Sequence, residues 1–192
     1  DLFQGFWVAK ERDDGLLKLR ITDFVTGEHH HIDMPEAVYS TGPGTNAEFD
    51  TATFRFVYQS YITPRTTYDY DVAKRSRKLL KQQPVLGGYK PEEYDSAMRM
   101  ATARDGTKVP VSLVWKKELR KGAPQPLLLY GYGSYGYPMD VGFRSSRLSL
   151  LDRGMVFATA HVRGGGDRGR PWYDDGKLAK KMNTFTDFIA AA

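Results

Sequence analysis

An apolar run that ends abruptly in glycines and aromatic residues most constrains how this chain folds. Residues 126–136 read PLLLYGYGSYG. The three leucines predict a strand buried on both faces, as in parallel sheets covered by helices, and the glycines allow a tight turn after it. In open α/β sheets such loops bind ligands, and a tyrosine hydroxyl there can donate a hydrogen bond to charge developing in a reaction. An ordinary Gly/Tyr turn after a buried strand fits this segment equally well.

The composition is that of a folded globular protein. Of the 192 residues, 41% are hydrophobic and 27% charged, which argues against a disordered chain. The absence of cysteine excludes disulfides, thiolate metal sites and cysteine nucleophiles, and no apolar run reaches the roughly 18 residues of a membrane span. The chain begins with Asp1, without an initiator Met or the basic start of a signal peptide, so we expect an internal segment of something longer.

The net charge of +5 allows a nucleic-acid-binding module as one interpretation. Basic residues are interspersed with acidic ones, however, except at residues 74–78 and 180–181. We therefore favour a solvated surface over a nucleic-acid footprint.

The first part of the chain, residues 1–84, predicts antiparallel strands and a linker. Alternating apolar residues and Gly-containing turns, such as the Asp14-Gly15 pair, indicate hairpins. Short strands at this spacing are typical of a propeller blade or a sandwich. The strands are expected at residues 3–10, 16–24, 29–32, 52–60, 67–72 and 78–82.

Residues 85–192 predict an α/β fold, because buried strands alternate there with helices. A hairpin is expected over 94–103 and 108–115, and a second continuous apolar strand over 154–162. A short helix over 145–153 should end at Gly154. A further helix should begin near Asn183 or Thr184, either of which suits the N-cap.

Histidine and arginine side chains supply three further candidates for functional groups. His29, His30 and His31 cannot all share one face of a strand, so we expect no metal site. Arg163 begins a glycine-rich loop and suits either a buried ion pair or a substrate clamp, the former being favoured. His161 lies in an apolar strand with no nucleophile nearby in sequence, which favours a core histidine over an acid–base catalyst.

The sequence contains no Gly-x-Ser-x-Gly nucleophile elbow. Five motifs, in order and spacing, nevertheless closely resemble the prolyl oligopeptidase family, and within it the oligopeptidase B branch. The resemblance covers essentially the whole chain. The motifs are YGYGSYG at 130–136, SRLSLLDRG at 146–154, HVRGGG at 161–166, WYDDGK at 172–177 and NTFTDF at 183–188.

The resemblance implies a serine peptidase in which a seven-bladed β-propeller caps an α/β-hydrolase domain. Residues 1–84 then correspond to the end of the propeller, and 85–192 to the first part of the hydrolase domain. The catalytic serine, aspartate and histidine are expected beyond Ala192, so this segment alone should be inactive.

The resemblance also assigns roles to individual positions. Tyr132 matches the tyrosine of the oxyanion hole, and Tyr135 an aromatic position near the substrate pocket. Asp140 matches the first of two acidic positions near basic substrate residues, while the second position falls on the uncharged Gly142. Asp167 stands where the family usually has a glutamate.

The function implied by this resemblance is cleavage of short peptides after Lys or Arg in the cytoplasm, without a cofactor, metal, nucleic acid or membrane. The remaining length of the parent protein would be needed for activity. A prolyl-specific peptidase of the same family is the alternative. The Gly-Ser-Tyr-Gly form of the loop and Asp140 favour the basic-specific branch.

Overall fold

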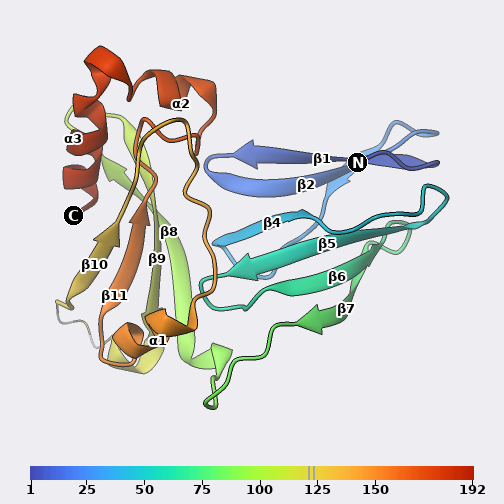
Figure 1. The fold of residues 1–192 in the computed structure, drawn as a ribbon, viewed down its shortest axis with the longest axis horizontal. Helices are drawn as coiled ribbons and strands as arrows, with labels where there is room; N and C mark the ends of the chain where they lie inside the picture. Colours follow the sequence, from blue (N-terminus) through green and yellow to red (C-terminus); the bar gives the residue numbers. More distant parts are fainter. Residues whose placement is uncertain (121, 123) are drawn as a thin grey trace.

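The structure is a computed structural model that describes residues 1–120, 122 and 124–192. The strands of these residues form three sheets, none of them closed into a barrel. Figure 1 shows two halves side by side: β1 to β7 on one side, and β8 to β11 with the helices on the other. The division of the chain near residue 84 into two domains stays a prediction.

The first sheet has the order β1-β2-β3, with β1 Phe6–Asp13, β2 Leu16–Asp23 and β3 His29–His31. The predicted β1–β2 hairpin is confirmed. Its two-residue turn places both Asp14 and Gly15 at positive φ, 45° and 90°, and such turns match the twist of the paired strands.

The second sheet has the order β4-β5-β6-β7, with β4 Tyr39–Pro43, β5 Thr53–Ser60, β6 Thr66–Asp71 and β7 Ser76–Gln82. Strand β5 falls where alternation predicts it, and β6 and β7 overlap the strands expected at 67–72 and 78–82. Phe54, Phe56 and Tyr58 are completely buried on one face of β5 and share a core with apolar residues of the first sheet. Strand β4 was missed, because its sequence, YSTGP, lacks the expected alternation.

The third sheet has the order β10-β11-β9-β8, with β8 Tyr94–Thr102, β9 Lys108–Lys116, β10 Leu127–Tyr130 and β11 Val156–Ala160. Strands β8 and β9 form the predicted hairpin, and β10 runs parallel to β11 as expected of an α/β fold. Antiparallel pairing of β11 with β9 makes the sheet mixed.

Both faces of this sheet are covered, one by a helix together with the first half of the chain and the other by two further helices. One face packs against Leu151 of α1 (Ser145–Leu151) and against Tyr61 from the first half. The other face packs against Trp172 of α2 (Arg170–Asp174) and Phe188 of α3 (Met182–Ala191). Short 3₁₀ turns span Pro91–Glu93, Lys117–Leu119 and Leu178–Lys180.

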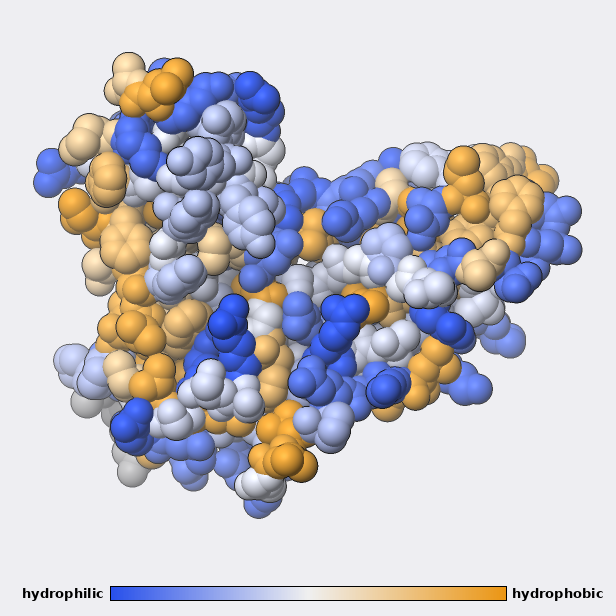
Figure 2. Space-filling view, viewed as in Figure 1, coloured by the Kyte–Doolittle hydropathy of each residue, from blue (hydrophilic) through white to orange (hydrophobic). Residues whose placement is uncertain are grey.

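The expected burial of β10 on both faces is wrong. Leu127 and Leu128 are 40% and 41% exposed, because β10 is the edge strand of the described sheet and pairs only with β11. Figure 2 shows apolar surface gathered on this edge of the molecule. The sequence pattern predicts an apolar strand, whereas the burial of that strand depends on which elements lie beside it in the fold.

The helix ends agree with the sequence at one site and disagree at another. Helix α1 is followed by Gly154 at φ 85°, as predicted. Helix α3 begins at Met182, so Asn183 and Thr184 lie inside its first turn and neither caps it. Their side chains instead bond to carbonyl oxygens of neighbouring loops. Helix α2 was not predicted. None of the described helices is long and apolar enough to cross a membrane.

Candidate functional site

The loop after β10, residues 131–136, turns at the carboxyl end of the strand. Gly133 and Gly136 adopt positive φ values of 67° and 65°. A Cβ on Gly133 would lie 2.5 Å from Thr184 Cγ2 and 2.6 Å from Val162 Cγ2. Glycine is therefore required at position 133 both for the backbone conformation and for the close approach of α3.

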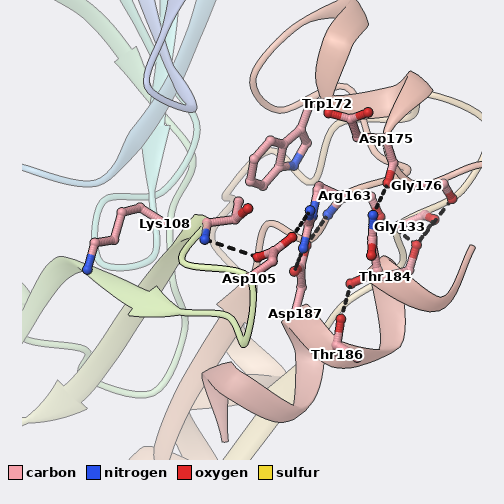
Figure 3. Close-up of polar contacts among 12 residues, drawn as sticks. Asp105, Lys108, Gly133, Arg163, Trp172, Asp175, Gly176, Thr184, Thr186 and Asp187 are labelled. Carbon is pink, nitrogen blue, oxygen red and sulfur yellow. Dashed lines mark hydrogen bonds and ion pairs between the residues drawn. The ribbon is translucent and has the colours of Figure 1, made fainter. Parts of the chain in front are cut away.

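Side chains at the start of α3 hold this loop in place. Lys181 Nζ donates to the Gly133 carbonyl at 2.5 Å and lies 2.9 Å from Ser134 Oγ. The Thr184 hydroxyl donates to the Arg163 carbonyl at 2.6 Å, which ties the neighbouring loop to the same helix (Figure 3). Burial lowers the pKa of Lys181. Side chains at the start of α3 therefore fix the conformation of this loop.

Tyr132 and Tyr135 project from this fixed loop toward solvent. Tyr132 is 46% exposed, and its ring meets that of Tyr137 edge-on, with the centroids 6.2 Å apart. Tyr135 is fully on the surface and has φ 57°, an uncommon conformation for a residue other than glycine. An exposed hydroxyl on a rigid loop can donate to a bound ligand, so the geometry is compatible with the role expected of Tyr132, which stays a prediction.

Arg163, in the loop after β11, is the centre of a buried ion-pair network (Figure 3). Its side chain donates to Asp187 through Nε at 2.9 Å and Nη2 at 2.6 Å, and to Asp105 through Nη1 at 2.6 Å. The Arg163 backbone N–H also donates to Asp187, at 3.0 Å. Since Arg163 is only 5% exposed, its favoured interpretation as a buried ion-pair partner is confirmed.

The network also shifts the pKa of Asp105 and that of Arg163. The hydrogen bond from Arg163 lowers the pKa of Asp105 to about 2, with help from the Thr107 backbone N–H. The bonds to Asp187 and Asp105 raise the pKa of Arg163. The network therefore joins the β8–β9 turn, the loop after β11 and α3 through two ion pairs of one guanidinium.

His161 is a buried histidine with both ring nitrogens engaged, as expected. Nδ1 lies 2.8 Å from Asp167 Oδ1, and Nε2 lies 2.5 Å from Ser112 Oγ. This is the order of atoms in a serine-protease triad, but all three residues are 2% exposed or less. Because a peptide bond cannot reach a serine at that depth, we assign the group a structural role. Asp167 also accepts from the Met139 backbone N–H at 2.8 Å, which fixes the segment before Asp140.

Asp140 lies on the segment between the Tyr132 loop and α1, facing the first half of the chain. Its carboxylate accepts a hydrogen bond from Arg12 Nη2 at 2.7 Å. It also lines a cavity of about 540 Å³ that is bounded by both halves. The structure therefore brings this predicted binding residue to a cavity but supplies it with an internal cationic partner.

The other charged residues that line this cavity are Arg144 and Arg147. The guanidinium carbon of Arg147 lies 4.7 Å from the ring centroid of Tyr61 and 4.1 Å from that of Phe157. Arg147 donates to the Gly142 carbonyl at 2.9 Å, and burial lowers its pKa. The cavity is therefore not an acidic one.

The three histidines lie on β3 with alternating exposure. His30 lies 3.0 Å from the Tyr70 hydroxyl, whereas His31 pairs with Glu11 at 3.2 Å. Adjacent histidines thus point to opposite faces, as expected. No group of three potential metal ligands occurs among the described residues.

Sequence reasoning missed three residues that shape this region: Arg12, Arg147 and Lys181. Arg12 meets Asp140 across 128 positions of the chain, and Lys181 meets Gly133 across 48. No local sequence pattern predicts pairings between residues so far apart in the chain. The sequence around Arg147, RSSRLSL, gives no sign that its guanidinium lies against two aromatic rings.

Comparison with known proteins gives two family matches. Residues 1–83 match "Prolyl oligopeptidase, N-terminal beta-propeller domain", and residues 141–192 match "Prolyl oligopeptidase family". Both describe the same family, in the order expected from the sequence motifs.

Individual relatives agree with this match. Dipeptidyl aminopeptidase BI of Pseudoxanthomonas mexicana is 47% identical over 98% of this chain, and Protease 2 of Moraxella lacunata is 40% identical over 94%. The solved structure of oligopeptidase B from Trypanosoma brucei with covalently bound antipain, in its closed form, superposes with a TM-score of 0.87 and 39% identity over 99% of the chain. The chain spans 26% of the length of these two curated relatives and 28% of the solved structure.

Proposed function

Because the chain belongs to the prolyl oligopeptidase family, we propose that it forms part of a serine oligopeptidase that hydrolyses short peptides after Lys or Arg. The similarity of nearly the whole chain to an oligopeptidase B structure supports this proposal. The catalytic serine would come from outside these residues, because the sequence holds no Gly-x-Ser-x-Gly. The residues described here would bind substrate and stabilise the transition state.

The observation that carries the proposal is Tyr132, exposed on a rigid loop at the carboxyl end of β10. In acyl transfer, attack by serine converts the peptide carbonyl into a tetrahedral oxyanion. A hydrogen-bond donor held in advance at that oxygen stabilises the transition state. The Tyr132 hydroxyl would be one donor, with a backbone N–H beside the serine as the other.

Substrate binding would involve Tyr135 and Asp140, from the same stretch of chain. Tyr135 presents an exposed ring on the same loop as Tyr132. Asp140 presents a carboxylate that is 43% exposed and lines the cavity between the halves. A carboxylate there suits a basic group of a peptide. The lack of an acid at position 142 argues against a requirement for two adjacent basic residues.

A second candidate is a dipeptidyl aminopeptidase, which the name of the 47% identical relative favours. In that case Asp140 would bind the protonated amino terminus of the substrate instead of a basic side chain. Both candidates share the acyl-transfer chemistry and the role of Tyr132.

Fluorogenic peptides tested on the full-length enzyme distinguish these functions. We expect cleavage of N-blocked substrates that end in Arg or Lys. Cleavage confined to dipeptides with a free amino terminus would favour the dipeptidyl aminopeptidase, and cleavage confined to proline-terminated substrates would contradict both.

We further propose a cytoplasmic enzyme that acts on peptides alone, as the family resemblance implies. A filter-binding assay checks the interpretation as a nucleic-acid-binding module. Salt-sensitive binding of RNA or DNA at micromolar protein would support that module against the peptidase proposal.

A further inference from the structure

The Asp140 carboxylate already accepts a hydrogen bond from Arg12, a cation of the same chain. We propose that Arg12 is a specificity-determining residue, which holds Asp140 and so opposes the binding of a second basic residue of the substrate. The inference rests on the proposed function, in which Asp140 faces basic groups of the peptide. Arg12 would set how strongly Asp140 selects for basic groups of the peptide.

The geometry holds the Arg12 guanidinium over Asp140 in advance. Nη2 donates to Asp140 Oδ1 at 2.7 Å, while Nη1 donates to the Gly15 carbonyl at 3.0 Å. The Arg12 side chain is 18% exposed. Because a second bond anchors the guanidinium to its own hairpin, Arg12 loses little freedom when it pairs with Asp140.

The hairpin that carries Arg12 is itself docked on the second half of the molecule. Asp14, in the β1–β2 turn, accepts a hydrogen bond from Arg168 Nη2 at 2.6 Å, and Arg168 Nη1 donates to the Lys108 carbonyl at 3.1 Å. Two ion pairs therefore connect one hairpin tip to the other half, and only one of them involves Asp140.

The surroundings of Asp140 offer no second acid to a basic substrate. Among the described residues that line the cavity, Asp140 is the sole carboxylate, beside Arg144 and Arg147. A Cβ at Gly142 would lie 3.3 Å from the Gln59 amide, so an acidic side chain there would require Gln59 to move. An incoming basic group must therefore share or take the carboxylate that Arg12 holds.

Removal of the Arg12 charge should make the site more selective for basic residues. Two cations at one carboxylate repel each other, and this repulsion is strongest where water is partly excluded. Partly exposed ion pairs contribute up to about 1 kcal/mol, or about two- to fivefold in a binding constant. We expect a change of that size.

The test uses the full-length enzyme and two N-blocked fluorogenic dipeptides, Arg-Arg and Ala-Arg. Arg12→Gln should lower KM for Arg-Arg, relative to Ala-Arg, by about two- to fivefold. In the Asp140→Asn background the same substitution should leave the ratio unchanged. An unchanged ratio in the single variant, or an effect that persists without Asp140, would overturn the inference.

Asp14→Asn is the matched control, because it breaks the other ion pair of the same hairpin tip and leaves the Arg12–Asp140 pair in place. The KM ratio should then stay at its wild-type value. An Asp14→Asn effect as large as that of Arg12→Gln would assign the change to hairpin docking and overturn the inference. A wild-type enzyme that cleaves neither peptide would contradict the proposed function itself, and this inference with it.

Discussion

Two arginine–aspartate pairs of this chain differ in how deeply they are buried. This difference distinguishes a structural ion pair from one at the proposed binding surface. Arg163 is 5% exposed and donates to two carboxylates through three side-chain nitrogens. Arg12 donates once to Asp140, whose side chain is 43% exposed. A buried charge cannot change partners without a large desolvation cost, whereas a partly hydrated pair can exchange one partner for a ligand. The Arg163 network therefore fixes the site, and the Arg12 pair adjusts it.

The largest expected effect tests the buried side of this comparison. Asp187→Asn should destabilise the protein by about 3–5 kcal/mol, because it leaves the Arg163 cation buried without its main partner. Asp105→Asn removes the other partner of the same guanidinium, but Asp105 is half-exposed, so water can replace it and the loss should be clearly smaller. Urea denaturation of both variants measures the two free energies of unfolding. Equal losses would contradict the assignment of Asp187 as the main anchor.

A second loss of stability, comparable or smaller, is expected where the scaffold meets the exposed loop. Gly133→Ala should cost about 1–2 kcal/mol for the left-handed backbone, and about 1–3 kcal/mol more for the clash with Thr184 and Val162. Gly27→Ala is the matched control, since Gly27 has φ 72° but a Cβ there would meet no atom within 4 Å.

Thermal unfolding compares these two glycine variants, and peptide hydrolysis reports on the loop. Only Gly133→Ala should also lower the hydrolysis rate, because it moves the backbone beside Tyr132. Equal stability losses and equal rates in the two variants would show that α3 does not fix the loop.

The sequence predicted the strands and hairpins well, because these depend on local alternation and turn chemistry. The β1–β2 turn and the buried Phe54, Phe56 and Tyr58 follow directly from such patterns. The exposure of β10 and the absence of a side-chain cap on α3 did not follow, since both depend on neighbours. The Thr184 hydroxyl donates to a carbonyl 21 residues away instead of capping the helix.

The candidate site was only partly predictable for the same reason. Arg163 could be recognised as an ion-pair residue from its apolar surroundings, but its partners lie 24 and 58 positions away. Tyr132, Tyr135 and Asp140 were assigned by resemblance, and Arg12 and Lys181 became visible only in the folded chain. Contacts between residues that are far apart in the chain cannot be predicted from local sequence patterns.

The central claim, that Tyr132 donates to the oxyanion, is tested most directly by Tyr132→Phe in the full-length enzyme. Tyr137→Phe is the control, since it removes a hydroxyl from the ring that meets Tyr132 edge-on. We predict that Tyr132→Phe lowers kcat by about 100- to 1,000-fold with little change in KM, whereas Tyr137→Phe stays near wild type. A Tyr132→Phe enzyme with the wild-type kcat would contradict the claim.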